Sequence, residues 1–236
     1  MKGPSPETIR STLDEILPGV QKPSRYLGLE KNLARKAWDA VTVRVALAFP
    51  DAYEIGMSHQ GTRILYHLVN RREDALAERS FAPMPDMAAA MRAQNVPLYT
   101  LESYRSVADF DIVGISLQSE LNYINVPYLL DLAGISRRAA GRDEDEPIVI
   151  GGGPCTANPE PVADFFDAIL IGDGEAAMDE ILNAVRDGRA AGERRLAVLR
   201  RLAAVPGVYV PCFYTRREGS DGNSGDWETT DPSATL

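Results

Sequence analysis

The stretch of sequence that most constrains the fold runs from Val43 to Gly61. It begins with the apolar run VRVALAF, whose β-branched and aromatic content is typical of a parallel strand covered on both faces. Pro50 ends this run, a loop with two glycines follows, and residues 62–70 show the apolar stripe of a helix. A strand, a glycine-containing loop and a helix form the first unit of a doubly wound α/β sheet, in which ligands bind beyond the carboxyl ends of the strands.

More apolar runs predict the other strands of the same sheet. We expect strands within residues 96–101, 110–116, 147–150 and 165–171. Residues 71–78 are charged and are expected to be a helix end or a loop, and the two prolines of residues 81–85 exclude a regular helix or a central strand. The pattern predicts a mostly parallel, five-stranded, doubly wound α/β fold with the flavodoxin-like strand order 2-1-3-4-5.

The chain divides into three parts by composition. Residues 1–40 are expected to form a short helix and an arm that packs on the main domain, and residues 41–211 form the α/β domain. Beyond Thr215 the chain turns to Arg, Glu, Gly, Ser, Asp and Thr, with little to bury. Residues 212–236 are therefore expected to be a disordered tail.

Charge and composition exclude several classes of function. The formal net charge of −9 argues against a nucleic-acid partner, because proteins that bind nucleic acid usually carry a basic face. No apolar run is long enough to span a membrane, and the N-terminal residues lack the apolar core of a signal peptide. A cytoplasmic protein is therefore expected. Cys155 and Cys212 are too few for a disulfide scaffold or a four-ligand metal site.

Four loops are expected at the carboxyl ends of the predicted strands, at residues 51–61, 118–125, 151–157 and 172–175. Three of these loops are rich in glycine, which permits positive φ and a close approach of the backbone to a ligand. One such loop alone is more often structural than functional. Three of them on one rim, with Ser116, Asn122 and Asn125 beside them, predict a binding site for a large planar ligand.

Individual side chains in these loops have alternative roles. Asp51 and Glu54 could act as a pair of carboxylates, but capping of the following turn is the expected role for at least one of them. His59 is a candidate for ligand contact, and Cys155 could face the ligand or be a small buried residue. The chain has no Gly-x4-Gly-Lys-Ser/Thr loop and no Gly-x-Gly-x-x-Gly after a strand, so kinase, NTPase and dehydrogenase functions lack their motifs.

Several long segments resemble the N-terminal half of a family of cobalamin-binding-domain radical SAM proteins of mostly unassigned function. The segments are RYLGLEKN, FPDAYEIGMSHQG, ILYHLVN, AERSFAPMPDM, PLYTLES, FDIVGISLQSELNYINV, IVIGGGPCTANPEPVADFFDA and ILIGDGEAAMDEI. Together they extend from about Arg25 to Pro211. The resemblance implies a Rossmann-like cobalamin module in front of a barrel-type radical SAM domain.

The resemblance also implies a set of cofactor-binding residues. Cobalamin domains supply a histidine to cobalt from the motif Asp-x-His-x-x-Gly, and Tyr53 stands in place of that histidine here. Because a phenol is a poor cobalt ligand at neutral pH, cobalamin would bind without a protein imidazole, Tyr53 would shield its lower axial face, and its nucleotide tail would lie beside Ser116 and residues 151–153. The residues expected to bind it are Asp51, Tyr53, Glu54, Gly56, Ser58, Ser116, Gln118, Asn122, Gly151, Gly152, Gly153, Gly172, Gly174 and Glu175.

The cysteines depart from the pattern of radical SAM enzymes. Such enzymes hold a 4Fe-4S cluster with Cys-x3-Cys-x2-Cys, and this chain has two cysteines in all. The resemblance therefore implies a binding module that is not catalytic alone. The cluster and S-adenosylmethionine (SAM) would belong to a full-length relative or to a radical SAM partner that acts in trans, and the chain itself would be a split or truncated protein or one that works with such a partner.

Two alternatives to a cobalamin module remain open. The same fold could dock on a barrel partner with an empty rim, and the replacement of the histidine by Tyr53 favours this interpretation. A flavodoxin-like carrier of FMN is the third candidate. It would need a phosphate loop directly after the first strand, and the segment PDAYE is a poor one.

Overall fold

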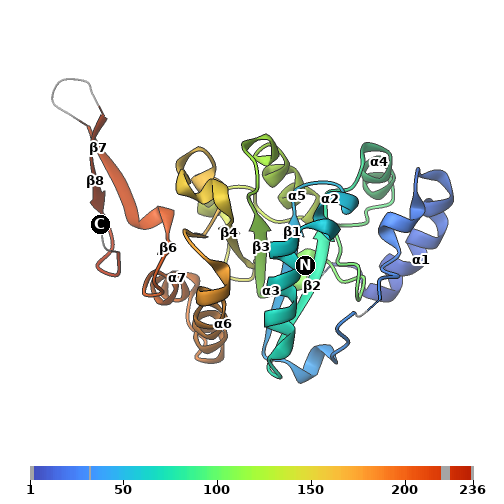
Figure 1. The fold of residues 1–236 in the computed structure, drawn as a ribbon, viewed down its shortest axis with the longest axis horizontal. Helices are drawn as coiled ribbons and strands as arrows, with labels where there is room; N and C mark the ends of the chain where they lie inside the picture. Colours follow the sequence, from blue (N-terminus) through green and yellow to red (C-terminus); the bar gives the residue numbers. More distant parts are fainter. Residues whose placement is uncertain (1–2, 32, 219–223, 235–236) are drawn as a thin grey trace.

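The computed structural model describes residues 3–31, 33–218 and 224–234 (Figure 1). Its centre is a six-stranded sheet with the strand order β2-β1-β3-β4-β5-β6. The strands are β1 (Val43–Phe49), β2 (Ala75–Phe81), β3 (Ile112–Ser116), β4 (Ile148–Gly152), β5 (Ala168–Leu170) and β6 (Val208–Tyr209). The first five strands pair in parallel, and β6 is antiparallel to β5. The predicted α/β class with a mostly parallel sheet is confirmed.

Helices cover both faces of the sheet, because the side chains of each strand alternate between two cores. Val43, Val45 and Leu47 of β1 belong to one core, and Ala46 and Ala48 belong to the other. The first core is covered by α3 (Gln60–Arg71), α6 (Gly174–Ala190) and α7 (Arg195–Ala203). The second core is covered mainly by α5 (Asn125–Ala133), with a contribution from α4 (Pro85–Ala93).

The N-terminal part packs at the β2 end of the sheet, away from β6 (Figure 1). Helix α1 (Pro6–Ile16) begins where the side chain of Ser5 accepts a hydrogen bond from the N–H of Thr8, with Pro6 at its first position. Its buried Ile9 and Leu13 join a third core with Tyr99. The described residues of the arm that follows contain short 3-10 turns before β1, and α2 (Tyr53–Ser58) follows β1.

The second strand of the sheet lies elsewhere in the sequence than predicted. Strand β2 is Ala75–Phe81, most of which was expected to be a helix end or a loop, whereas residues 96–101 contribute only the isolated bridge of Tyr99 to Ser106. The prediction was wrong because the charged side chains of β2 are buried with partners. Glu78 accepts hydrogen bonds from Thr100 and Ser103, and Arg79 pairs with Glu102.

The C-terminal region adds a strand to the sheet and then a hairpin. Residues 207–211 were expected to be a short strand or an extended exit, and β6 lies within them. The segment expected to be a disordered tail contains, in its described part, β7 (Tyr214–Glu218) and β8 (Ser224–Thr229), which pair antiparallel. This hairpin projects from the β6 end of the molecule (Figure 1). None of the described helices is both long and apolar enough to cross a membrane.

Candidate functional site

A cavity of about 470 Å³ lies at the carboxyl ends of the central strands, between α3 and α6. Its floor is the face of the sheet that carries Val45, Leu47, Ile112 and Ile150. Its walls are apolar residues of the two helices, namely Leu65, Met178 and Ile181. Its mouth is formed by the ends of β3 and β4 and by the turn that opens α6. A cavity of this volume is in the range of small-molecule sites.

The floor is hollow because glycine occupies the centre of β3. Successive residues of β3 point to opposite faces of the sheet, and the face toward the cavity carries Ile112, Gly114 and Ser116. Gly114 is partly exposed although its strand is central in the sheet. A Cβ atom placed at Gly114 would meet only Leu47 Cδ2, at 3.5 Å. A Cβ atom at this position would therefore enter the cavity without meeting backbone within 4 Å.

Glycines also shape the mouth. A Cβ atom at Gly152 would meet nothing within 4 Å, so a side chain there would extend into open space. Gly153 and Gly172 have φ values of +114° and +126°, which L-residues rarely adopt. A Cβ atom at Gly153 would also lie 2.8 Å from the carbonyl oxygen of Leu117. These positions keep bare backbone at the mouth of the cavity.

Four of the polar side chains at the mouth have no partner within the described part of the chain. The carboxylates of Asp173 and Glu175, at the start of α6, make no hydrogen bond or ion pair there. The side chains of Ser116 and Gln118, at the end of β3, likewise make no hydrogen bond with described residues. The mouth thus offers both donors and acceptors to a ligand, above an apolar floor.

His59 also lines this cavity, as the residue that caps α3. Its Nδ1 accepts a hydrogen bond from the backbone N–H of Thr62 at 3.1 Å. This bond requires an unprotonated Nδ1 and places the ring proton on Nε2. In this arrangement His59 can donate a hydrogen bond to a ligand, but its Nε2 has no lone pair to offer to a metal.

Eight of the fourteen residues expected from the sequence line the cavity. They are Ser116, Gln118, Gly151, Gly152, Gly153, Gly172, Gly174 and Glu175. These residues come from three loops that are far apart in the sequence and meet because β3, β4 and β5 are neighbours. The remaining six lie outside its lining.

Asp51 and Asn122 form a link between two loops of the rim. Asp51 Oδ1 accepts the N–H of Ala52 at 2.7 Å, and Asp51 Oδ2 accepts Asn122 Nδ2 at 3.1 Å. Asn122 is buried and also donates to the carbonyl of Pro50 at 3.2 Å. Both side chains therefore hold the loops after β1 and β3 together.

The acidic and hydroxyl side chains of α2 have partners within the protein. Glu54 forms ion pairs with Arg25 at 2.8 Å and Lys22 at 3.6 Å, so it ties the N-terminal arm to α2. The hydrogen bond with Arg25, first among several causes, lowers the pKa of Glu54. Ser58 donates to the carbonyl of Ile55 at 2.9 Å. A Cβ atom at Gly56 would lie 2.4 Å from Phe81, so this glycine serves close packing.

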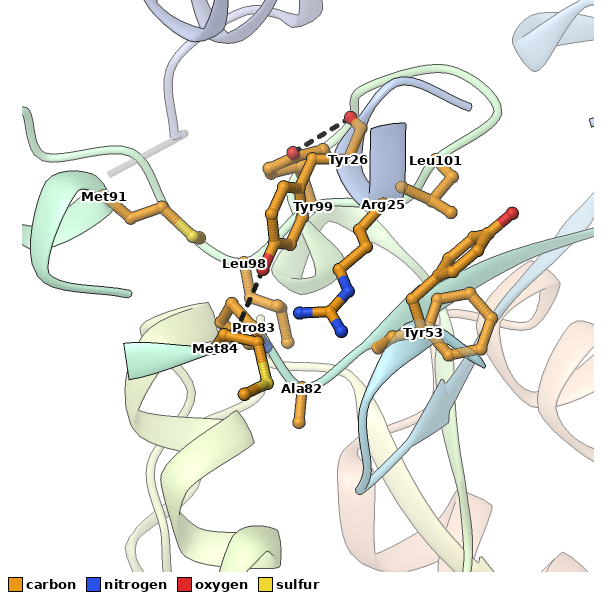
Figure 2. Close-up of a pocket in the computed structure, with 11 residues that line it drawn as sticks. Arg25, Tyr26, Tyr53, Ala82, Pro83, Met84, Met91, Leu98, Tyr99 and Leu101 are labelled. Atoms are coloured by element: carbon orange, nitrogen blue, oxygen red, sulfur yellow. Dashed lines mark hydrogen bonds between the residues drawn. The ribbon is translucent and has the colours of Figure 1, made fainter. Parts of the chain in front are cut away.

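Tyr53 lies at a separate, small cavity of about 20 Å³, which it lines together with Arg25 and Tyr26 (Figure 2). Its ring packs edge-on against Phe81, and its hydroxyl donates to Glu30 Oε1 at 2.6 Å. Burial, together with the hydrogen bond to Glu30, raises the pKa of Tyr53 to about 12. The small cavity has space for about one water molecule and cannot hold a cofactor. The phenol of Tyr53 remains protonated at neutral pH.

The apolar walls were not identified from the sequence. Leu65 of α3 was assigned only to the apolar stripe of residues 62–70, which does not distinguish a core contact from a cavity wall, and Met178 and Ile181 of α6 were not singled out. Asp173 was noted only as part of the turn that opens α6. Its position between Gly172 and Gly174 at a strand end is the signal that could have identified it.

Neither cysteine belongs to a metal site within the described residues. Cys155 is partly buried and Cys212 is exposed, and both are free thiols. No group of three or more His, Cys, Asp or Glu side chains is arranged to hold a metal ion in the described ranges.

Comparison with known proteins gives one family and one curated relative. The family model described as "Radical SAM proteins, N-terminal" matches residues 61–211, which include every strand of the main sheet except β1. An uncharacterized protein of Methanocaldococcus jannaschii is 27% identical over 143 residues, which cover 59% of this chain. The chain spans about a quarter of the length of that relative, because the match covers 26% of it.

Proposed function

The chain belongs to the family of radical SAM proteins, whose N-terminal region it matches, and from this premise we propose that it is a cobalamin-binding module. Its glycine-lined cavity would hold the nucleotide tail of the cofactor. The radical chemistry would be carried out by a cluster-bearing domain or chain. The observation that supports this proposal is the cavity itself, which extends from the glycine loops down the sheet to Val45 and Ile112.

The floor of the cavity suits a planar heterocycle. Leu47, Ile112 and Ile150 supply apolar surface, and Gly114 leaves room between them. Burial of an aromatic base against this surface would be favoured by the hydrophobic effect. The volume is that of a small ligand, so the corrin ring would lie outside, over the rim.

The rim suits the periphery of a corrin ring. Asp173 and Glu175 can accept hydrogen bonds from amide substituents, and Gln118 can donate and accept. Large apolar side chains are exposed in the rim loop after β3, where Leu121 and Ile124 are 86% and 77% exposed. A ring placed over the rim would cover apolar surface of this kind.

The residues at the site support binding without a protein ligand to cobalt. The hydroxyl of Tyr53 is held by Glu30, and the Nδ1 of His59 is held by the N–H of Thr62. When bound, cobalamin would supply a carrier for a methyl group. The residues of this chain would bind the tail, orient the ring and shield one side of it from water.

An absorbance titration with hydroxocobalamin tests the proposal. Gly152→Trp would place an indole in the mouth of the cavity and should abolish saturable binding. Gly141→Trp is the matched control, because Gly141 is exposed, has no neighbour within 4 Å of a Cβ atom and lies outside the cavity. Wild type and Gly141→Trp should bind equally, and circular dichroism would verify that both variants fold.

A cofactor-free docking module is the alternative that the same titration tests. Failure of wild type to bind hydroxocobalamin or methylcobalamin at high micromolar concentration would contradict the cobalamin proposal. Docking on a partner through the exposed apolar rim would then be the function that remains. Equal binding by Gly152→Trp would also contradict the cobalamin proposal, since the cofactor would then bind elsewhere. A parallel titration with FMN tests the flavodoxin-like alternative.

A further inference from the structure

A second cavity, of about 670 Å³, lies on another side of α3. Gly61 and Leu65 of α3 line the glycine-lined cavity described above, whereas Ile64 and Leu68 line the second one. Residues of the N-terminal arm, among them Lys31, also border the second cavity. It is separate from the proposed cobalamin site, because the two share no lining residue.

The charged side chains at this cavity are mainly cationic, although the whole chain carries a net charge of −9. Lys31, Arg63 and Arg79 line it, and Glu30 is the one acidic residue among the described residues of its lining. Glu30 Oε1 accepts the hydroxyl of Tyr53 at 2.6 Å, and Glu30 Oε2 is closed to solvent. Glu30 also makes no ion pair with a described residue. It therefore leaves the cations of this cavity unpaired.

Two of these cations are free to attract an anion. The side chains of Lys31 and Arg63 are exposed and make no hydrogen bond or ion pair with described residues. Arg63 lies three positions before Tyr66 on α3, and residues at this spacing are neighbours on the surface of a helix. The guanidinium of Arg79 lies 4.2 Å from the centre of the Tyr66 ring. Arg63 and Arg79 are therefore on the same side of α3.

Arg79 supplies a fixed donor at the wall of the cavity. Its side chain is 8% exposed, its Nε donates to Glu102 at 2.7 Å, and its Nη1 donates to the sulfur of Met57 at 3.5 Å. Its Nη2 makes no hydrogen bond with a described residue. This atom is open to solvent, because among the described residues that are not exposed only Glu30 Oε2 is both unpartnered and closed to solvent. Since Arg79 lines this cavity, its Nη2 can donate to a ligand there.

We propose that this cavity binds a phosphate dianion, either free or carried by a small organic molecule. Arg79 Nη2 would donate to one phosphate oxygen, and Lys31 and Arg63 would match the two negative charges. An anion with a single charge would leave one of these two cations unmatched. The volume is in the range of small-molecule sites, so an organic group on the phosphate would have room to contact Ile64 and Leu68.

Calorimetric titration of the full chain at about pH 8 tests this assignment, because a phosphomonoester has a second pKa of about 6 and is a dianion there. The probes are inorganic phosphate, phenyl phosphate and methyl phenyl phosphate, a diester that keeps the ring but carries one negative charge. Phenyl phosphate should bind about fivefold more tightly than the diester, since an additional exposed ion pair contributes up to about this factor. The ionic strength is kept low and constant, because salt screens such attraction.

The two sources of phosphate give different results. Tighter binding of phenyl phosphate than of inorganic phosphate assigns the site to a phosphorylated small molecule, because the ring then contacts the apolar lining. Equal or weaker binding of phenyl phosphate assigns the site to free phosphate. Either result supports a site for a phosphate dianion.

Variants with the same change in charge locate the ligand. Arg63→Gln removes one cation from α3 and Lys31→Gln removes one from the arm, and each should weaken the binding of phenyl phosphate about fivefold. Arg71→Gln is the matched control, because Arg71 is exposed at the end of the same helix and lies outside the cavity. It should bind phenyl phosphate as wild type does. The three positions are exposed, so circular dichroism should show an unchanged fold.

Several outcomes would overturn the assignment. These are no saturable binding of either phosphate or phenyl phosphate at millimolar concentration, equal affinities for phenyl phosphate and its diester, and unchanged affinity in Arg63→Gln or Lys31→Gln. An equal loss in Arg71→Gln would also overturn it, because the attraction would then be general to the surface. Hydroxocobalamin should bind Arg63→Gln as tightly as wild type, since Arg63 is outside the glycine-lined cavity. Failure of one proposal is therefore distinguishable from failure of the other.

Discussion

Arg79 holds both carboxylate oxygens of Glu102 with its own backbone and side chain. The N–H of Arg79 donates to Glu102 Oε2 at 2.8 Å, and its Nε donates to Oε1 at 2.7 Å. Both side chains are more than nine-tenths buried. The N–H concerned lies on the outer edge of β2, which has no neighbouring strand on that side. Glu102 thus satisfies an edge group that would otherwise be free to pair with another chain.

Replacement of Glu102 by alanine should destabilise the fold strongly. The substitution leaves the Arg79 guanidinium buried without its carboxylate, and loss of one partner of a buried ion pair costs about 3–5 kcal/mol. The free energy of unfolding should be measured by urea denaturation at pH 8, with Glu15→Ala on the exposed face of α1 as the control. A loss no larger than that of the control would show that Arg79 finds another partner.

The same carboxyl group predicts how stability depends on pH. Burial raises the pKa of Glu102 to about 7, although Arg79 opposes this shift and Glu78 adds to it. A carboxyl whose pKa is raised in the folded state binds more protons there than in the unfolded chain. Its contribution to stability is therefore present below the unfolded pKa and is lost as the pH rises through about 7.

Glu102→Gln tests this dependence because glutamine does not titrate. The difference in unfolding free energy between wild type and Glu102→Gln should change between pH 5 and pH 8, with wild type losing stability relative to the variant as the pH rises. Burial also raises the pKa of Glu78, but Glu78 is present in both proteins and its effect largely cancels. A difference that is constant with pH would contradict the raised pKa of Glu102.

The sequence predicted the architecture well where apolar runs mark strands, and failed where polar residues are buried. Strands β1, β3, β4 and β5 were located because their residues are almost all apolar. Strand β2 reads ALAERSF, and its three polar residues conceal a strand whose every residue is buried. The partners of Glu78 and Arg79, such as Glu102, lie more than twenty positions away, so no local pattern could reveal that these two residues are paired.

The candidate site was predicted in part for a related reason. Glycine loops after β3, β4 and β5 are visible in the sequence, and their meeting follows from parallel strand order. The loop after β1 was expected to join them, and His59 and Gly61 at its end do line the cavity. Tyr53 and Glu54 instead turn toward the N-terminal arm, where Glu30 and Arg25 bind them. That arm is far from the loop in the sequence, so local reasoning could not identify these partners.

Two glycines expected to bind the cofactor should respond differently to alanine. A Cβ atom at Gly56 would lie 2.4 Å from two ring atoms of Phe81, so Gly56→Ala should reduce the free energy of unfolding by about 1–3 kcal/mol. A Cβ atom at Gly152 meets nothing within 4 Å, so Gly152→Ala should stay within about 0.5 kcal/mol of wild type. Thermal unfolding of the two variants measures the contrast, and equal stabilities would show that Phe81 moves aside.

Gly114→Val should block the cavity from its floor and leave the fold intact. The new Cβ would be in ordinary contact with Leu47 Cδ2 at 3.5 Å, and a β-branched residue suits a central strand. The side chain would occupy the space proposed for the heterocyclic base, so the affinity for hydroxocobalamin should fall at least about tenfold while the unfolding free energy stays within about 1 kcal/mol of wild type. Gly141→Val, outside the cavity, should change neither quantity. If Gly114→Val folds and binds hydroxocobalamin as wild type does, the tail of the cofactor does not enter this cavity.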